Sequence, residues 1–286
     1  RAVRLCNSGV MAASAKLLFD LLSEIDDNNA SGELYLTDVI GKAVGRGLPC
    51  TAVRCAERET LGVNSRVELM QAEKEFQTLR RAEALEDGIS MPAPETVHFS
   101  YDTVIGRDAI IEQNVVFGPG VTVESGAQIR AFSHLEGAHV SRGCIVGPYA
   151  RLRPGAELAE DVKIGNFVEI KASTLDEGAK VNHLSYIGDA HIGARANIGA
   201  GTITCNYDGV MKHNTSIGEA AFIGSNTMLV APITIGQDAM TASGSVITRD
   251  VPAGDLAIAR SKQDNKAGFS VKLMNKLRAL KAAKQN

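Results

Sequence analysis

The sequence contains no tryptophan, and aromatic residues make up only 5% of its 286 residues. A core would therefore have to be built from small and branched side chains, and 44% of the residues are hydrophobic. No run of 18 apolar residues occurs and no secretory signal is visible, so we expect no membrane span. The net charge of −3 gives no general attraction to nucleic acid or to an anionic membrane.

The five cysteines are an odd number and form no paired framework. Reduced thiols in a cytoplasmic protein are the simplest interpretation. Cys50 and Cys55 lack the close spacing and the second pair of ligands that are typical of a zinc site.

A repeat of six residues runs from Ile105 to about Arg249. Aliphatic (once aromatic) residues recur at this interval, with three steps of five, at Ile105, Ile111, Phe117, Val123, Ile129, Leu135, Val140, Val146, Leu152, Leu158, Ile164, Ile170, Leu175, Val181, Ile187, Ile192 and Ile198. The pattern is lost from Thr202 to Ser216 and resumes at Ile217, Ile223, Leu229, Ile235, Thr241 and Ile247.

A period of six matches neither an α-helix, whose period is about 3.6, nor a lone strand, whose period is about 2. It is typical of a solenoid in which each hexapeptide forms a short strand and a turn, and three hexapeptides close a triangular coil. The sequence therefore predicts a mainly β chain, with a loop projecting from the prism between Thr202 and Ser216.

The patterns divide the chain into four segments. Residues 1–64 are predicted to be a partial α/β unit, 65–94 a linker helix (a charged helix from Arg66 to Leu85), 95–250 the solenoid, and 251–286 a tail with a basic amphipathic helix from Ser270 to Lys284. Ser14 is a candidate cap for the first helix, and Thr51–Cys55 is predicted to be a strand. The chain opens at Arg1 without Met, inside a predicted strand that reaches Cys6, so we expect an upstream portion to be missing.

Two cations share a spacing that the solenoid makes meaningful. Three hexapeptides, which make one complete coil, separate Arg153 from Lys171. We therefore expect them to stack on one face, where an arginine fork and a lysine point charge can bind phosphate. His183 is a candidate general base because a free imidazole titrates at about pH 6.5. A lone histidine is nevertheless more often structural.

Four motifs carry a resemblance to a known family. They are Gly147–Gly155, Gly165–Lys171, His183–Asp189 and Asn197–Gly209, of which the last is long and highly specific. With residues 28–38 and 62–66, they resemble the C-terminal three-fifths of the bacterial bifunctional N-acetylglucosamine-1-phosphate uridyltransferase / glucosamine-1-phosphate N-acetyltransferase family. The resemblance covers nearly the whole chain.

This resemblance implies a left-handed parallel β-helix that assembles as a homotrimer, preceded in residues 1–64 by the end of a uridyltransferase domain. It also implies acetyl transfer from acetyl-CoA to the amine of glucosamine 1-phosphate. The product, N-acetylglucosamine 1-phosphate, would serve the synthesis of UDP-N-acetylglucosamine. Acetyl-CoA would be a co-substrate and Mg²⁺ would serve only the uridyltransferase half. Neither nucleic acid nor a membrane is expected as a partner.

By the same resemblance, His183 is the general base, and Glu169 crosses to hold its tautomer as a carboxylate does in a catalytic triad. The sugar-phosphate contacts would be Arg153, Lys171, Tyr186, Asn197 and Lys212. The acetyl-CoA contacts would be Ala200, Asn206, Tyr207, Ser225, Ser243 and Arg260. Residues 241–245 read Thr-Ala-Ser-Gly-Ser, where the family more often has Ile-Gly-Ala-Gly, so the role of Ser243 is less clearly implied. Cys205 beside Asn206 is an alternative nucleophile, but direct attack by the amine needs no covalent intermediate.

Two residues resemble parts of the uridyltransferase site. Asn7 resembles a UDP-sugar contact, and Asn64 resembles a Mg²⁺ ligand whose Asp partner would lie upstream. The glycine-rich nucleotide loop of a uridyltransferase is not in this sequence. We therefore expect the parent protein, but not this chain, to have that activity.

Three other functions fit parts of the sequence. The spacing of His98, His134 and His139 resembles the zinc histidines of γ-class carbonic anhydrases. A solenoid can also be a trimerisation module without catalysis, or a hexapeptide acetyltransferase that acts on another acceptor. Metal analysis, the effect of His183→Ala, and activity on glucosamine without phosphate would discriminate among them.

Overall fold

The computed structural model describes residues 5–284. Residues 1–4, most of the expected opening strand, lie outside the described residues. The chain forms two compact units, one ending at Thr78 and the other beginning at Leu79, and each is described by itself.

The first unit has a small helical core. Helix α1 (Ala15–Leu22) packs on α2 (Asp38–Gly45) through the buried side chains of Leu21, Val39 and Ala43. Ser14 caps α1 as predicted, since its Oγ accepts a hydrogen bond from the Leu17 amide at 3.4 Å. A 3₁₀ turn, η1 (Glu57–Thr60), follows. Within residues 5–64 the structure contains no strand, so the β part of the expected α/β unit is wrong there. Thr51–Cys55 has no ladder partner among these residues.

Helix α3 (Arg66–Glu86) confirms the predicted charged helix, and its last turns belong to the second unit. There Arg80 donates to the carbonyl of Thr103 at 3.0 Å and Arg81 to that of Val97 at 2.9 Å. Ala84 joins the core of the solenoid. The last turns of the helix therefore cover the first coil, and η2 (Pro94–Thr96) lies within that coil, between the bridging residues Ser90 and His98.

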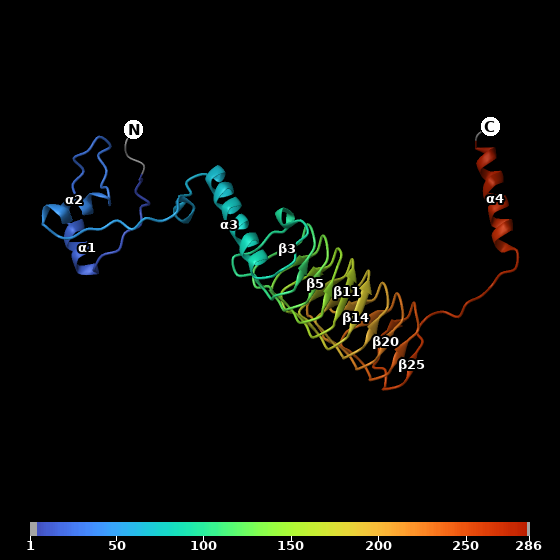
Figure 1. The fold of residues 1–286 in the computed structure, drawn as a ribbon. Helices are drawn as coiled ribbons and strands as arrows, with labels where there is room; N and C mark the ends of the chain where they lie inside the picture. Colours follow the sequence, from blue (N-terminus) through green and yellow to red (C-terminus); the bar gives the residue numbers. More distant parts are fainter. Residues whose placement is uncertain (1–4, 285–286) are drawn as a thin grey trace. The chain divides into compact units, whose positions relative to one another are not determined.

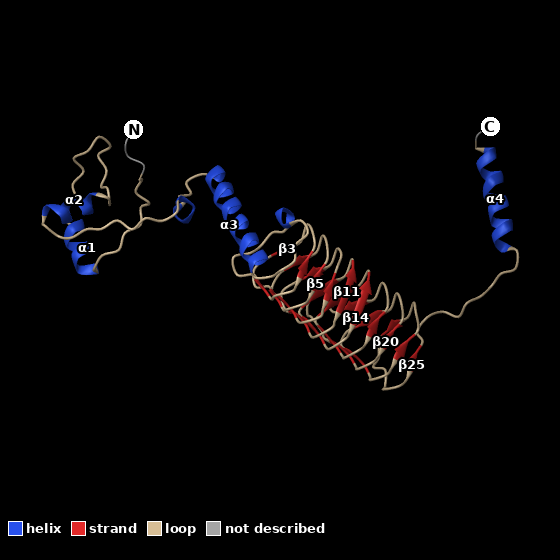
Figure 2. Ribbon diagram, viewed as in Figure 1, coloured by secondary structure: helices blue, strands red, loops and turns tan. Residues whose placement is uncertain are grey.

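The second unit is a triangular prism of three parallel sheets, in which successive strands fall on successive faces (Figures 1 and 2). Sheet 1 contains β1 (Val104–Ile105), β4 (Thr122–Val123), β7 (Ala138–Val140), β10 (Ala156–Leu158), β13 (Ser173–Leu175), β16 (Ala190–Ile192), β19 (Thr215–Ile217) and β22 (Ile233–Ile235). Sheet 2 contains β2 (Ile110–Ile111), β5 (Gln128–Ile129), β8 (Ile145–Val146), β11 (Lys163–Asn166), β14 (Lys180–His183), β17 (Asn197–Ile198), β20 (Phe222–Ile223), β23 (Met240–Thr241) and β25 (Leu256–Ala257). Sheet 3 contains β3 (Val116–Phe117), β6 (His134–Leu135), β9 (Arg151–Leu152), β12 (Glu169–Lys171), β15 (Tyr186–Gly188), β18 (Ile203–Cys205), β21 (Met228–Val230) and β24 (Val246–Ile247).

The register confirms the hexapeptide solenoid. Ile170 pairs with Leu152 in the preceding coil and with Ile187 in the next, so a coil consists of three hexapeptides or of one residue fewer. From Ile111 to Ile247 the periodic residues are all buried, and the apolar ones form one continuous core. Pairing begins with a bridge between Ser90 and Ile110 and reaches β25, so the coils extend on both sides of the expected range 95–250. The left-handed winding stays a prediction.

The projecting loop is narrower than predicted. Ile203–Cys205 is strand β18, and Thr204 occupies the inward position, fully buried, six residues after Ile198. Its hydroxyl donates to the Gly188 carbonyl at 3.1 Å and accepts from the Gly188 amide at 2.8 Å. The aliphatic pattern does not mark this position, because a threonine with a satisfied hydroxyl fills it. The loop therefore comprises residues 206–214.

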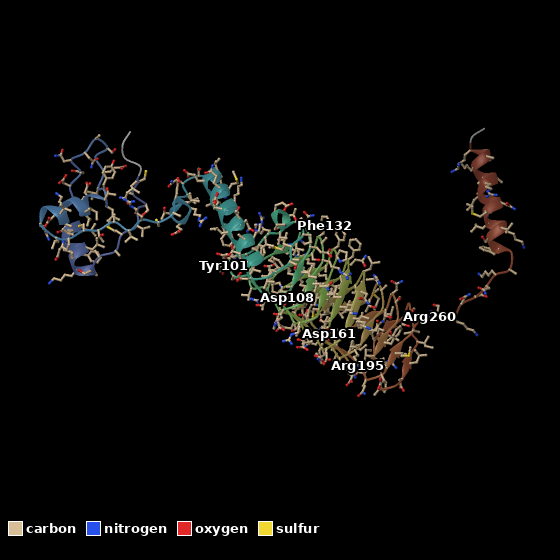
Figure 3. The ribbon with its side chains drawn as sticks, viewed as in Figure 1. Tyr101, Asp108, Phe132, Asp161, Arg195 and Arg260 are labelled. Atoms are coloured by element: carbon tan, nitrogen blue, oxygen red, sulfur yellow. The ribbon has the colours of Figure 1, made fainter. Side chains whose placement is uncertain are left out.

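The corners of the prism repeat a left-handed backbone conformation. Between sheets 2 and 3, positive φ angles occur in successive coils at Phe132, Tyr149, Phe167, Leu184, Gly201, Asn226 and Gly244. The rings of Phe132, Tyr149 and Phe167 stack there, with centroids 4.9 and 5.3 Å apart. Another corner carries Asp108, Asp161 and Arg195, which lie along one edge of the prism (Figure 3).

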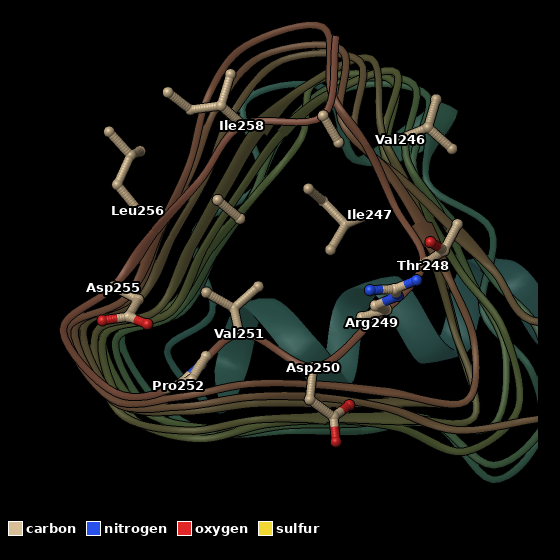
Figure 4. Close-up of a pocket in the computed structure, with 12 residues that line it drawn as sticks. Val246, Ile247, Thr248, Arg249, Asp250, Val251, Pro252, Asp255, Leu256 and Ile258 are labelled. Atoms are coloured by element: carbon tan, nitrogen blue, oxygen red, sulfur yellow. The ribbon is translucent and has the colours of Figure 1, made fainter.

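The last coil leaves the end of the prism open. Figure 4 shows its triangular section, with Ile247 and Val251 inside and Asp250 outside. A pocket of about 420 Å³ opens here, lined by residues 246–252 and 255–259. Helix α4 (Phe269–Ala283) agrees within one residue with the predicted tail helix, and all its residues are exposed. No helix among residues 5–284 is long and apolar enough to cross a membrane.

Candidate active site

Arg153, Lys171 and Asp189 form a ladder at the corner between sheets 3 and 1. The amide of Arg153 donates to the Ile170 carbonyl at 2.9 Å, and that of Asp189 donates to the Lys171 carbonyl at 3.0 Å. Each residue therefore lies one coil beyond the previous one. The structure confirms that the spacing of three hexapeptides places the two cations in neighbouring coils.

Each cation of this ladder already has a carboxylate partner. Arg153 Nη1 lies 2.8 Å from Glu169 Oε1, and Lys171 Nζ lies 3.1 and 3.0 Å from the two oxygens of Asp189. The hydrogen bond with Glu169 raises the pKa of Arg153. The pair of Lys171 and Asp189 is the more enclosed, with side chains 15% and 16% exposed. Both cations are therefore held in fixed positions from which they can meet a phosphate.

The imidazole of His183 is held by an amide. His183 ends β14 in sheet 2, and its Nδ1 lies 2.9 Å from Oδ1 of Asn166, the residue opposite it in β11. If Nδ1 carries the proton and donates to Asn166, Nε2 has the lone pair that a general base needs. The side chain is exposed, so Nε2 can reach a substrate.

The expected pair of Glu169 and His183 is wrong in this structure. Glu169 lies opposite Tyr186 in sheet 3 and binds Arg153 instead. Glu169 and His183 are separated in the sequence by less than one coil. The chain therefore turns a corner of the prism between them, and the two residues lie on different faces. Asn166, which the sequence reasoning missed, precedes His183 by one coil and pairs with it across the ladder.

Asn206, Tyr186 and Asp189 form a polar cluster beside Lys171. The side chain of Asn206 is buried, and its Nδ2 donates to Asp189 Oδ2 and, at 3.4 Å, to Tyr186 Oη. A Cβ at Gly188 would lie 2.7 Å from Tyr186 Cζ and 2.9 Å from Asn206 Nδ2, so this cluster requires glycine there. Asp189 was not among the candidates, although its position three hexapeptides after Lys171 is a signal that could have found it.

The loop 206–214 brings Lys212 to this cluster. Tyr207 and Lys212 form an antiparallel bridge, and His213 Nε2 lies 2.7 Å from Asp208 Oδ2, which holds the pKa of Asp208 well below its usual range. The contact with Lys171 lowers the pKa of Lys212. The pKa of Lys171 is raised, mainly by its hydrogen bond with Lys212 and to a smaller extent by its hydrogen bond with Asp189. Two amines and one carboxylate thus share a small space.

Four of the expected acetyl-CoA residues lie in one column that starts at His183. At the corner between sheets 2 and 3, the Gly201 amide donates to the His183 carbonyl at 3.2 Å. The next coils continue from Ala200, whose carbonyl accepts from Asn226 at 2.7 Å, to Ser225, whose carbonyl accepts from Gly244 at 2.8 Å. Arg260 then donates to the Ser243 carbonyl at 3.0 Å. The column therefore follows the prism axis from the candidate base to a cation.

Other candidates lie elsewhere. Asn197 is in sheet 2, between Lys180 and Phe222. Asn7 Oδ1 accepts from the Gly9 amide at 2.9 Å in the first unit. Asn64, also in the first unit, donates its amide to Glu68 at 2.6 Å. One amide oxygen does not make a Mg²⁺ site, because that ion takes six ligands.

The histidines of the carbonic-anhydrase alternative do not converge. His134 lies in sheet 3, in line with His98 two coils earlier, whereas His139 lies in sheet 1 and binds Glu124 at 3.0 Å. Across residues 5–284, no three His, Cys, Asp or Glu side chains come together as a possible metal site.

The second unit is thus a solenoid of hexapeptide repeats with an exposed imidazole and a ladder of paired cations on its surface. Residues 102–137 and 214–249 match the family model described as Bacterial transferase hexapeptide (six repeats). The chain is 64% identical over 284 residues to the bifunctional protein GlmU of a Jannaschia species (strain CCS1). It is 66% identical over 284 residues to that of a Ruegeria species (strain TM1040). Each alignment covers 99% of this chain and 63% of the relative. The chain is thus similar over nearly its whole length to the bifunctional protein GlmU.

The chain spans less than two thirds of the length of these relatives. Among solved structures, an Arabidopsis UDP-N-acetylglucosamine acyltransferase aligns with 57% of this chain and 70% of its own, at 14% identity and a TM-score of 0.35.

Proposed function

We propose that this chain transfers an acetyl group from acetyl-CoA to the amine of glucosamine 1-phosphate, in the cytoplasm. The observation that carries the proposal is the pair of columns on neighbouring corners. The column between sheets 2 and 3 runs from the exposed imidazole of His183 along the candidate CoA residues. The column between sheets 3 and 1 contains the two cations, Arg153 and Lys171, in neighbouring coils. Identity of 64% to a GlmU protein over 99% of the chain supports the same activity.

The chemistry follows from these positions. The amine nitrogen attacks the thioester carbonyl, a C–N bond forms, and the C–S bond breaks. His183 Nε2 takes the proton that the amine loses, and the imidazolium can return it to the departing CoA thiolate. Asn166 Oδ1 accepts from Nδ1–H in both states, so the ring keeps its orientation throughout.

The remaining residues bind and orient the two substrates. Arg153, Lys171 and Lys212 would bind the phosphate, while Tyr186 and Asn197 would contact the sugar. Ala200, Asn206 and Tyr207 would place the thioester. Ser225, Ser243 and Arg260 would follow the CoA chain, with the guanidinium on a CoA phosphate.

The assembly that we propose is a homotrimer of left-handed β-helices. Asn197 and Lys171 belong to faces of the prism that point in different directions, so a sugar between neighbouring chains could meet both. Mg²⁺ would be required only for uridyl transfer by the longer parent protein.

A thiol-release assay with acetyl-CoA and glucosamine 1-phosphate tests the function. His183→Ala should lower kcat by about 10²- to 10⁴-fold, because the general base is lost. The matched control is His191→Ala, which removes an imidazole bound to Asp176 at 2.9 Å in sheet 1 and should leave the rate unchanged. A wild-type chain without activity, or a fully active His183→Ala variant, would overturn the proposal.

The same assay separates this reaction from acetyl transfer to another acceptor. Arg153→Ala should raise KM for glucosamine 1-phosphate, since the guanidinium is a phosphate contact. Comparable activity on glucosamine without phosphate, undiminished by Arg153→Ala, would instead favour a different hexapeptide acetyltransferase.

A further inference from the structure

Asp189 lies between the two groups of substrate residues. Its carboxylate accepts from Lys171 Nζ with both oxygens, at 3.1 and 3.0 Å, and Oδ2 also accepts from Asn206 Nδ2. Lys171 belongs to the phosphate candidates, and Asn206 to the thioester candidates. One largely enclosed carboxylate therefore orients a donor in each group.

The backbone of Asp189 adds a second connection. Its carbonyl accepts from the amide of Thr215 at 3.1 Å. Asn206 is the first residue of the loop 206–214, and Thr215 is the first residue after it. Asp189 thus holds both ends of the loop that carries Lys212, through its side chain at one end and its backbone at the other.

We propose that Asp189 is a positioning residue that couples the sugar-phosphate site to the thioester site. The inference rests on the proposed function for the identity of the two substrates, but not for the anchoring of the loop. An ammonium has three donors, so Lys171 can keep its bond to Asp189 while it binds a phosphate oxygen. The amide of Asn206 stays oriented at the same time, so each substrate meets a site that the same carboxylate has ordered.

Asp189→Asn is the informative variant. Asp189 has φ +48°, a left-handed conformation that asparagine adopts more readily than most residues. The new side chain has the same shape but only one acceptor oxygen. It can satisfy Lys171 or Asn206, but it presents an NH₂ group to the other.

In the thiol-release assay, Asp189→Asn should raise KM for both substrates, with the two effects together reaching about tenfold or more, because a hydrogen bond with a charged partner is lost. The control is Asp176→Asn, which alters a surface aspartate bound to His191 and should change neither KM. A rise confined to one KM, or a fall in kcat alone, would overturn the coupling.

Hydrogen exchange of the amides in residues 206–215 gives a readout that needs no activity. Exchange should be faster in Asp189→Asn than in wild type, while Asp176→Asn should match wild type, at equal thermal unfolding midpoints. Unchanged exchange in Asp189→Asn would refute the positioning role even if the wild-type chain proved inactive. Inactivity of the wild-type chain with glucosamine 1-phosphate would refute the proposed function alone.

Discussion

At the scale of single residues, the proposed chemistry depends on partners that lie one coil apart. The imidazole of His183 meets Asn166 in the preceding coil, and the ammonium of Lys171 meets Asp189 in the next. In a solenoid the neighbour in space is the residue one coil away in the sequence. A side chain that serves as base or cation can therefore be held by a partner from an adjacent strand, without a loop to supply it.

The amide partner of His183 predicts how the rate depends on pH. Asn166→Asp would place a carboxylate beside Nδ1, and an opposite charge favours the protonated imidazole. The acidic limb of the kcat/KM profile should therefore move to higher pH, with activity retained near pH 8.5. Asn166→Ala should instead lower kcat by about tenfold without that displacement, because the ring loses its orientation. Identical profiles for wild type and Asn166→Asp would show that Asn166 does not hold the ring during catalysis.

The lowered pKa of Lys212 predicts that the chain takes up a proton when it binds glucosamine 1-phosphate. Lys171 lowers the pKa of Lys212 in the free chain, and a bound phosphate dianion favours the charged amine and raises it again. Affinity for glucosamine 1-phosphate should therefore fall as pH rises through the lowered pKa. Lys212→Met should remove this part of the pH dependence.

Titration calorimetry at a series of pH values above about 7 measures this uptake, because a phosphate with a second pKa of about 6 is already a dianion throughout that range. The apparent enthalpy should vary with the ionisation enthalpy of the buffer for wild type and much less for Lys212→Met. Equal buffer dependence in both proteins would assign the proton to another group.

At the scale of the strands and turns, the six-residue period predicted which side chains point inward. It did so because the repeat is a property of the backbone coil. The inward positions therefore recur every six residues, regardless of which side chain occupies them. The aliphatic pattern alone did not predict that Thr204 points inward, because this threonine is buried with its hydroxyl bonded to Gly188. The pair expected between Glu169 and His183 failed for a geometric reason. The chain turns a corner of the prism between these two residues, so they lie on different faces, and the number of residues between them does not show this.

Thr204→Val tests the contribution of that hydroxyl. Valine keeps the shape but leaves the buried amide of Gly188 without its acceptor, so unfolding in urea should require about 1–3 kcal/mol less free energy. Thr174→Val, on the exposed outer face of β13, is the matched control and should change stability by less than about 0.5 kcal/mol. Equal stability of Thr204→Val and wild type would mean that the inward position needs only the shape of the side chain.

At the scale of the whole molecule, the three faces of the prism point in different directions. Lys171 lies on sheet 3 and Asn197 on sheet 2, yet both are candidates for contact with one sugar. If the proposed trimer places the substrate between chains, one chain supplies Lys171 and its neighbour supplies Asn197. Sites made in this way can be rebuilt from two defective chains, which a site within one chain does not allow.

Mixing Lys171→Ala with Asn197→Ala chains, after dissociation and reassembly, tests this arrangement. Each variant alone should be strongly impaired, because every site lacks one contact. In an equal mixture of random trimers, about a quarter of the sites should pair an intact Lys171 with an intact Asn197 and regain activity. Mixing the same variants without dissociation is the control and should give no recovery. Absence of recovery after reassembly, with trimers verified by sedimentation, would place both residues in the site of a single chain or remove Asn197 from it.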